Sequence, residues 1–312
     1  MYIGIDLGGT NIAAGVVSND GKIIKTDSRP TLSKRPYQEI IKDMSELCLK
    51  LLEECDLKVS DLDGIGIGSP GTIDSTNGVV VYSNNLEWNN VPICEELKKY
   101  IDVPIRIEND ANAAAYGEYI INGDNVDSFV AITLGTGVGG GVIINKNIYR
   151  GFNGAGGELG HITLVHNGEH CTCGNDGCWE AYASVTALIR QTKKAIEENP
   201  ASLLAKEAEK EGKVSGRTSF NAAKEGDAVA EKVVDRYIEY VADGITSIIN
   251  IFQPNILVIG GGISKEGDRL LVPIKEYVKK HSYCKAIAQT EIKIATLMND
   301  AGIIGAAFAS AQ

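Results

Sequence analysis

The 312-residue sequence has no apolar run approaching 18 residues, and its N-terminus, MYIGIDLGGT, has no basic stretch followed by an apolar segment. The first absence excludes a membrane-spanning helix, and the second argues against a secretory signal. We therefore expect a globular protein in the reducing cytoplasm, with no membrane partner. The length exceeds the roughly 100 to 200 residues of a usual domain, so two domains with a full hydrophobic core are expected.

Positive charge is also scarce. The chain has 30 Lys and Arg against 41 Asp and Glu, a formal net charge of −11. Sequence-independent binding to nucleic acid needs clustered Lys and Arg, so no nucleic-acid partner is expected. An acidic protein that handles phosphates must instead use backbone amides, helix ends or Mg²⁺.

The Walker pattern G-x-x-x-x-G-K-[ST] is absent, but G-x-G-x-x-G occurs twice, at residues 66–71 and 135–140. A dinucleotide site requires a helix after these glycines, whereas VVVY and VIIN predict strands, so a Rossmann site is not expected. A glycine turn between two strands can still wrap a phosphate chain, because convergent backbone N–H groups meet no Cβ.

The first such turn, GGTN, follows the predicted strand YIGIDL. Thr10, Asn11 and, in the later turn, Thr136 would add side-chain donors. Asp6 ends the first strand, where it either holds Mg²⁺ through water or caps the turn as an Asx residue. The sequence leaves both roles open.

The chain is organised as alternating strands and helices, and near residue 128 its opening pattern begins again. VAITLGTGVGGGVIINKNIY aligns with IGIDLGGTNIAAGVVSNDGKI at an offset of about 127 residues, so that Asp6 matches Thr133 and Gly8 matches Gly135. Both copies place a glycine-rich turn between two strands, which predicts a duplicated α/β architecture. Helices are expected over 184–199, 227–252 and 299–312, and a buried strand over NILVI before the glycines at 260–262.

The stretch IENDANA places Asp110 between a buried strand and an Ala-rich helix. Phosphoryl transfer to an alcohol needs a carboxylate beside the attacking hydroxyl, and Asp110 is the candidate for that base. The same residue type in the same place is commonly a helix N-cap. Sequence alone does not choose between these two roles.

The C-x-x-C redox motif is absent, and four of the seven cysteines, Cys48, Cys55, Cys94 and Cys284, are scattered and expected to be ordinary buried thiols. The other three have the spacing Cys171-x-Cys173-x₄-Cys178. Three interpretations are open, a disulfide, reactive thiols and structural zinc, and the spacing favours zinc with one histidine. The histidine is left open among those at 161, 166 and 170.

Five motifs, IGIDLGGTN, IENDANAAAYGE, LGTGVGGG, GAGGELGH and CTCGNDGCWEAYAS, occur in this order between Met1 and the final helix. Together they resemble the ROK family of sugar kinases and sugar-responsive repressors, within the actin/hexokinase superfamily, and the cysteine motif is most similar to that of the family's glucokinases. The resemblance implies an α/β fold of the two-lobed, duplicated actin-like or ribonuclease H-like ATPase class with a zinc loop at 161–178. It implies a small lobe over 1–118, joined by the C-terminal helix at about 299–312, and a large lobe over 119–298.

The resemblance also assigns roles to single residues. Asp110 matches the family's catalytic base. The zinc ligands are expected to be His161, Cys171, Cys173 and Cys178. The expected sugar ligands are Gly71, Asn85, Asn109, Asp110, Glu158, His161 and Glu180, with Asn84 as a further candidate. The expected ATP and Mg²⁺ residues are Asp6, Gly8, Gly9, Thr10, Asn11, Thr136, Gly137, Gly260, Gly261 and Gly262.

The implied activity is ATP-dependent phosphorylation of a hexose at the C6 hydroxyl, with glucose as the expected substrate and the two lobes closing around it. One rival is a kinase of N-acetylmannosamine, fructose or allose, which shares these motifs. The other is a non-enzymatic sugar sensor or repressor; family repressors carry a helix-turn-helix before the phosphate loop, and Asp6 leaves no room for one. ATP and polyphosphate both remain as donors, and a homodimer or higher homo-oligomer is expected from the family.

Overall fold

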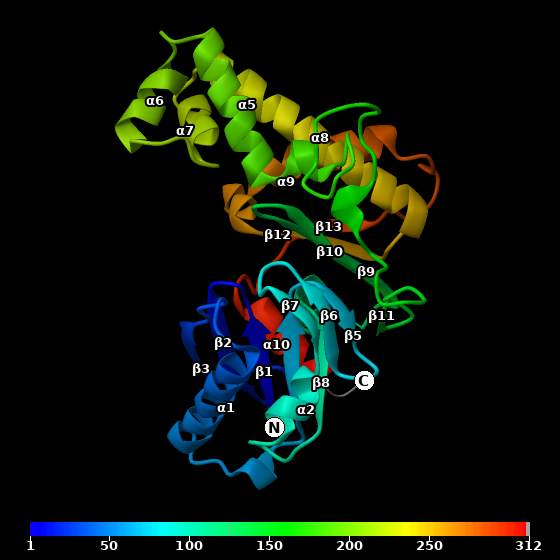
Figure 1. The fold of residues 1–312 in the computed structure, drawn as a ribbon. Coiled ribbons are helices and arrows are strands. Elements are labelled where there is room, and N and C mark those ends of the chain that lie inside the picture. The colour runs from blue at the N-terminus through cyan, green and yellow to red at the C-terminus, as the bar shows by residue number, and fades with distance from the viewer. Residues whose placement is uncertain (124, 310–312) are drawn as a thin grey trace. The chain divides into compact units, whose positions relative to one another are not determined.

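The structure, a computed structural model, describes residues 1–123 and 125–309 (Figure 1). They form two compact units. The first contains Met1–Ala131, Gly141–Gly157 and the C-terminal segment from Thr296, and the second contains Ile132–Gly140 and Glu158–Ala295. These units are groups of residues in mutual contact, so the predicted lobes at 1–118 and 119–298 remain a prediction.

Two five-stranded sheets share one strand order, which confirms the duplicated α/β architecture. Counted along the chain, each sheet runs third, second, first, fourth, fifth. The hairpin partners are antiparallel, and the last two strands of each sheet pair in parallel. The first sheet consists of β1 (Tyr2–Leu7), β2 (Asn11–Val17), β3 (Ile23–Pro30), β4 (Gly64–Ser69) and β8 (Ile105–Asn109). The second consists of β9 (Ser128–Leu134), β10 (Val138–Ile144), β11 (Asn147–Ile148), β12 (Ile256–Gly260) and β13 (Glu291–Ile294).

The central strands of the first sheet alternate isoleucine with glycine, so the isoleucines lie on one face of the sheet and the glycines on the other. Ile3 and Ile5 are fully buried in one hydrophobic cluster with residues of α1 (Tyr37–Glu54). On the other face lies α10 (Asp300–Ala309), where a Cβ on Gly4 would come 1.8 Å from the Ile303 carbonyl oxygen. Glycine is therefore required because a helix backbone lies directly on the strands.

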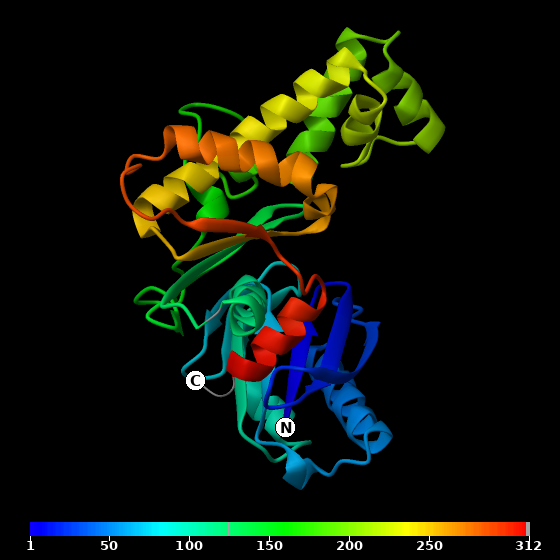
Figure 2. The ribbon, with the colours of Figure 1, turned by 180° about the vertical axis from the view of Figure 1, so that it is seen from behind.

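The same close packing explains one of the two G-x-G-x-x-G matches. A Cβ on Gly66 would lie 1.7 Å from the Ala306 carbonyl oxygen of α10. Figure 2 shows α10 beside α3 (Asp110–Asn122), and the two helices also approach closely, since a Cβ on Gly305 would lie 1.6 Å from the Ala113 carbonyl oxygen. Both glycine motifs are followed by strands, as predicted, so neither begins a dinucleotide-binding helix.

The first unit also contains a small second sheet, formed by the chain after β4. A three-stranded antiparallel sheet has the order β5-β6-β7. Its strands are β5 (Thr72–Asp74), β6 (Val79–Ser83) and β7 (Trp88–Val91), and it is followed by α2 (Ile93–Lys98); a short 3₁₀ turn, η1 (Val59–Asp61), precedes β4.

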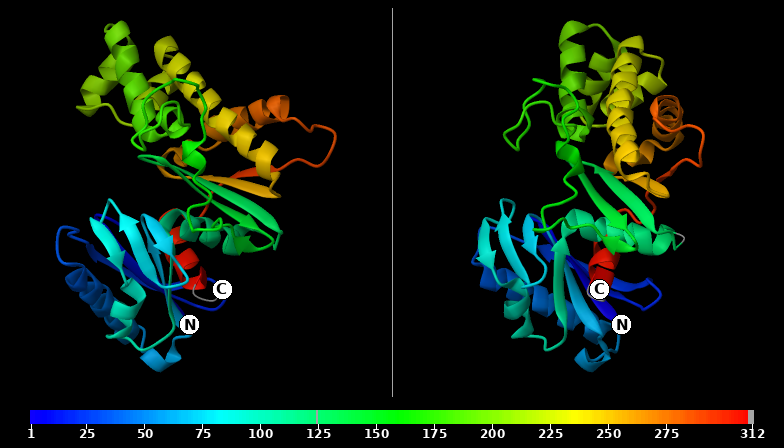
Figure 3. Two further views of the ribbon diagram at one scale, coloured as in Figure 1. Left: turned by 45° about the vertical axis from the view of Figure 1, so that its right-hand side comes forward. Right: turned by 90° about the vertical axis from the view of Figure 1, so that its right-hand side faces the viewer.

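Helices make up most of the second unit. The longest described helix, α8 (Ala228–Phe252), lies beside α9 (Asp268–His281) (Figure 3). The apolar side of α8 is fully buried, as its 3.6-residue pattern predicted. The other helical elements are η2 (Leu159–His161), α4 (Glu180–Ala183), α5 (Val185–Glu198), α6 (Leu203–Glu211), α7 (Thr218–Lys224) and η3 (Gly262–Glu266).

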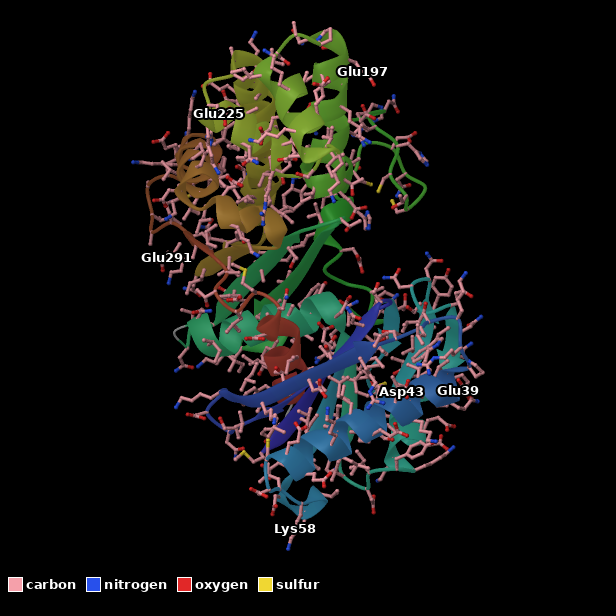
Figure 4. All side chains as sticks on the ribbon, turned by 90° about the vertical axis from the view of Figure 1, so that its left-hand side faces the viewer. Glu39, Asp43, Lys58, Glu197, Glu225 and Glu291 are labelled. Carbon is pink, nitrogen blue, oxygen red and sulfur yellow. The ribbon has the colours of Figure 1, made fainter. Side chains whose placement is uncertain are left out.

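The C-terminal helix was expected over 299–312; α10 spans Asp300–Ala309, and the predicted residues 310–312 lie outside the described residues. Among the described residues, none of the helices combines the length and the apolar character needed to cross a membrane. The negative charge is spread over both units, with Glu39 extending from α1 and Glu197 from α5 (Figure 4).

Candidate functional site

The junction between β8 and α3 presents Asp110 at the start of a helix. The N-cap is Asn109, whose Oδ1 accepts hydrogen bonds from the N–H groups of Ala111 (3.0 Å) and Asn112 (3.2 Å). The alternative that Asp110 is itself the N-cap is therefore wrong. Asp110 is the first helical residue, and its Oδ1 accepts from Ala111 N–H at 2.9 Å. That contact fixes one carboxylate oxygen and leaves Oδ2 available.

Asp6 and Asp110 form an unusual pair of largely buried carboxylates in the first unit. Burial, followed by the negative charge of Asp110, raises the pKa of Asp6 to about 6. Burial also raises the pKa of Asp110, against the opposing effect of the Ala111 N–H. Neighbouring carboxylates with little exposure are costly to ionise unless a cation or ligand joins them, so this pair is a candidate functional site. The turn after Asp6 is closed by Gly8 N–H donating to Asn11 O (2.9 Å), without the Asp6 side chain.

A buried carboxylate also stabilises the junction between β8 and α3. Glu108 is 3% exposed, and its Oε1 accepts from the Asn109 N–H (3.0 Å) and from Asn112 Nδ2 (3.1 Å). Its Oε2 accepts from Arg150 Nε at 2.6 Å. A buried charge is tolerated where it is paired and hydrogen-bonded in this way, so Glu108 and Arg150 hold the strand end that carries Asp110.

The first glycine turn, residues 8–11, is held in place by hydrogen bonds from a threonine that follows β3. Thr31 follows β3, is fully buried, and donates from Oγ1 to Gly8 O (2.6 Å) and from its N–H to Thr10 O (2.8 Å). Asn85 packs on this turn, because a Cβ on Gly9 would lie 3.2 Å from the Asn85 Cβ.

Gly71, another predicted sugar-site residue, lies in the same unit. Its φ is +109° and a Cβ there would lie 2.1 Å from Tyr82 O, so only glycine fits. Its carbonyl accepts from Asn109 Nδ2 at 3.2 Å. The first unit therefore brings together Asp6, the glycine turn, Asn85, Gly71, Asn109 and Asp110.

The predicted metal ligands meet in the second unit. His161, Cys171, Cys173 and Cys178 each offer one ligand atom, and these four atoms lie within 4.8 Å of one another. Cys171 Sγ is 3.7 Å from His161 Nδ1, and the sulfurs of Cys173 and Cys178 are 3.6 Å apart. Zinc–sulfur bonds of about 2.3 Å at the tetrahedral angle separate two sulfurs by about 3.8 Å, so the cluster fits zinc. A disulfide would need about 2.05 Å, which excludes that alternative.

The histidine left open by the sequence is now assigned. His161 faces the thiols, whereas His166 is exposed and His170 Nδ1 pairs with Asp176 Oδ1 at 2.9 Å. Of the scattered cysteines, Cys48 is buried and burial raises its pKa to about 12, in agreement with an inert core thiol. Cys55, Cys94 and Cys284 are half-buried.

The cysteine loop is anchored to helix α8 by the residues that follow it. Trp179 is fully buried and donates from Nε1 to Tyr240 O at 2.8 Å. Tyr182 packs against Tyr240 with its ring tilted by 48° and the ring centroids 4.9 Å apart, and its hydroxyl accepts from Glu169 N–H at 2.6 Å. The loop therefore has a fixed base on α8, although its own exposed residues contribute few apolar contacts.

Glu180 connects this loop to the second glycine turn. Its Oε1 is 3.6 Å from Cys171 Sγ, and its Oε2 accepts from Val138 N–H at 2.9 Å. A Cβ on Gly137 would lie 2.2 Å from that Oε2, so a larger residue there would displace the carboxylate. The turn receives two more hydrogen bonds, from Val185 N–H to Gly135 O (2.8 Å) and from Thr186 Oγ1 to Thr136 O (2.7 Å).

The third glycine turn also lies in the second unit. Gly261 has a φ of +88°, and a Cβ there would lie 2.2 Å from Leu134 O, directly before the second glycine turn. A Cβ on Gly262 would meet nothing within 4 Å. Glu158, another predicted sugar ligand, immediately precedes η2 and is exposed. The second unit therefore brings together the metal ligands, Glu180 and two glycine turns.

Sequence reasoning missed the residues that hold these groups in place. Thr31 and Thr186 bond to the predicted site residues Gly8 and Thr136, over 23 and 50 residues of chain. Arg150 bonds to Glu108, which supports the strand end before Asp110, over 42 residues. None of them belongs to a spaced motif, so only the fold reveals them.

Known proteins are similar to this chain over nearly its whole length. A profile described as the ROK family matches residues 2–312. The glucokinase of Thermotoga maritima is 40% identical over 307 residues, covering 98% of this chain and 95% of that protein. The crystal structure of a ROK family glucokinase from Streptomyces griseus in complex with glucose and AMPPNP matches with a TM-score of 0.80 at 34% identity, covering 98% of this chain and 97% of that one. The xylose repressor of Bacillus subtilis is 31% identical over 305 residues, covering 97% of this chain and 75% of that protein.

Proposed function

We propose, because this chain belongs to the ROK family, that it is a sugar kinase that transfers the γ-phosphoryl group of ATP to the C6 hydroxyl of glucose. The observation that carries the proposal is the pair of largely buried carboxylates, Asp6 and Asp110, in the same unit as a glycine turn that Thr31 holds by a hydrogen bond. Similarity to the glucokinase of Thermotoga maritima and to the Streptomyces griseus enzyme, which was crystallised with glucose and AMPPNP, supports the choice of substrates.

Asp110 is proposed as the general base. Its Oδ1 is occupied by Ala111 N–H, so Oδ2 accepts the hydrogen of the sugar C6 hydroxyl and orients that oxygen. As the C6 oxygen bonds to the γ-phosphorus, the bond from that phosphorus to the bridging oxygen breaks, ADP leaves with the electron pair, and Asp110 takes the proton. A raised pKa suits this task, because a stronger base takes the proton more readily near neutral pH.

The phosphate chain is proposed to be held by residues of both glycine turns, through backbone N–H groups and the side chains of Thr10, Asn11 and Thr136. Asp6 is the proposed carboxylate for Mg²⁺, which when bound would neutralise charge on the transferred phosphoryl group. The raised pKa of Asp6 supports this role, because its ionised form lacks a cationic partner until such a cation arrives. Gly260, Gly261 and Gly262 are proposed to lie under the adenosine.

The sugar is proposed to be recognised by hydrogen bonds from Gly71, Asn85, Asn109, Asp110, Glu158, His161 and Glu180. Such groups discriminate between sugars, because an inverted or missing hydroxyl leaves a buried polar atom unpaired. The proposed zinc is structural. His161 and the three cysteines complete a four-ligand set, so no position remains for water or substrate. The proposed setting is the reducing cytoplasm, where these thiols stay available as ligands.

A coupled assay for ADP release over a panel of glucose, mannose, fructose, allose and N-acetylmannosamine tests the proposal. Glucose should give the highest kcat/KM with ATP as donor, and polyphosphate should be compared in the same assay by measuring sugar phosphate. A higher kcat/KM for another sugar would replace glucose as the substrate. Sugar binding without turnover for any donor would favour the second candidate, a sugar-binding regulator, to which similarity to the Bacillus subtilis xylose repressor points. The homodimer stays a prediction, which sedimentation analysis would test.

A further inference from the structure

The segment directly after the last cysteine ligand fastens the second glycine turn at three points. Between residues 180 and 186, a carboxylate, a backbone N–H and a hydroxyl each bond to the turn. The Glu180 carboxylate accepts from Val138 N–H, Val185 N–H donates to Gly135 O, and Thr186 Oγ1 donates to Thr136 O. All six residues belong to the second unit.

We propose that residues 180–186 form a clamp that sets the shape of the phosphate-binding turn 135–138, and that Thr186 is a positioning residue for ATP within that clamp. The proposal rests on the proposed kinase function, because it takes the turn to be a phosphate site. It goes further by assigning ATP affinity to residues that need not touch ATP, and by making that affinity depend on the metal cluster.

Two features of the turn explain why it needs a clamp. Its glycines allow N–H groups to converge on a phosphate, but they also leave the backbone free to adopt other conformations. A Cβ on Gly135 would meet nothing within 4 Å, so side-chain packing does not restrain that end. Hydrogen bonds to the carbonyls of Gly135 and Thr136 fix the peptide planes whose N–H groups would face the phosphates.

The metal cluster controls the clamp through Glu180, which lies two residues after Cys178. One Glu180 oxygen is 3.6 Å from Cys171 Sγ and the other holds Val138 N–H. Disorder of the cysteine loop would move this carboxylate and release the turn. The clamp thus predicts that loss of metal weakens nucleotide binding even when no sugar is present.

Thr186→Val tests the clamp because it removes one hydroxyl at an exposed position and keeps the side-chain shape. One hydrogen bond corresponds to roughly a fivefold to tenfold change, and we expect KM for ATP to rise by that factor. KM for the sugar and the metal content should stay at wild-type values, and Thr186→Ser should recover ATP affinity to within about twofold, as expected of a retained hydrogen bond. Thr192→Val is the control for loss of a threonine hydroxyl elsewhere in the same helix, since Thr192 is buried and its Oγ1 donates to Leu188 O at 2.7 Å; its melting curve is recorded as well.

A second readout separates the clamp from turnover. The dissociation constant of a non-hydrolysable ATP analogue, measured by calorimetry without sugar, should rise in Thr186→Val and rise further in metal-stripped protein. Wild-type analogue affinity in both samples would overturn the proposal, as would a Thr186→Val enzyme with unchanged KM for ATP. If wild-type protein binds the analogue but turns over no sugar, the proposed kinase function fails while the calorimetric test of the clamp still stands. Thr186→Ala serves as the second variant should Thr186→Val lose its wild-type melting curve.

Discussion

The two glycine turns occupy equivalent places in the duplicated fold, yet different parts of the chain hold them. In both turns a threonine hydroxyl and a backbone N–H from outside bond to two carbonyls of the turn. For residues 8–11 both groups come from Thr31, immediately after the third strand of the same sheet. For residues 135–138 they come from Thr186 and Val185, beyond the cysteine loop, with Glu180 as a third contact.

This difference separates a turn built into the sheet from a turn that depends on a ligand cluster. The strand β3 pairs with β2 along its whole length, so Thr31 is placed by sheet hydrogen bonds and a fully buried position. The support for the second turn depends on a loop that fits a metal and has few apolar contacts. Metal binding commonly supplies the folding free energy that such loops lack.

Of the effects that distinguish the two turns, the largest should be local opening of the second turn alone when the metal cluster is broken. In Cys178→Ser, hydrogen exchange at residues 135–138 should accelerate at least about tenfold, as local opening predicts, while residues 8–11 keep wild-type protection. Sugar binding should also be lost, because Glu180 and His161 are disordered. The control is Cys284→Ser, a half-buried thiol outside the cluster.

Two outcomes would break this comparison. Equal acceleration in both turns would mean that the whole chain is destabilised. Removal of one metal ion per chain with an unchanged sugar KM would contradict the structural role of the cluster.

The next effect is a loss of kcat/KM for ATP at low pH, which is expected from a residue of the first repeat and not from its counterpart in the second. Asp6 has a pKa raised to about 6, whereas the corresponding residue of the second repeat, Thr133, does not titrate. The carboxylate must be ionised to hold Mg²⁺, so kcat/KM for ATP should reach its plateau about one pH unit above this pKa, fall to half near pH 6 and approach a tenfold loss per pH unit well below it. The measurement is a pH profile from 4.5 to 8 with metal content checked at each point. A profile flat down to pH 4.5 would remove Asp6 from this role.

The smallest effect concerns the brace of the first turn. Thr31→Val should raise KM for ATP about fivefold, because the Gly8 carbonyl loses a buried hydrogen bond of about 1 kcal/mol. The ratio of KM for ATP between Thr31→Val and wild type should be the same before and after metal removal, since the position of Thr31 does not depend on the cluster. The measurement is KM for ATP in wild type and in Thr31→Val, each with and without the metal, together with a melting curve of each protein. If instead Thr31→Val released metal, the two turns would not be independent.

The repetition of the fold could be predicted from sequence because the evidence is local. Strand, glycine turn and strand recur at a fixed offset, and both sheets have the same strand order. The cysteine spacing predicted a metal cluster for the same reason. The resemblance to a known family supplied the choice of His161, which the spacing alone left open among three histidines.

The supporting residues could not be predicted, because their partners are distant in sequence. Arg150 meets Glu108 and Thr31 meets Gly8 only after the sheet forms. Sequence also left one local pattern open, the choice between base and N-cap for Asp110; the N-cap of α3 is Asn109. A carboxylate and an amide side chain at adjacent positions satisfy the same capping rule, so the pattern alone could not choose between them.

The central claim, that Asp110 is the base of a sugar kinase, is tested most directly by Asp110→Asn. The substitution keeps the size of the side chain, and its amide oxygen still accepts from Ala111 N–H, but it removes the basic oxygen. Turnover of glucose with ATP should fall by about 10² to 10⁴, the range for loss of a general base, while calorimetry shows glucose binding within about tenfold of wild type. An Asp110→Asn enzyme with wild-type kcat would contradict the account.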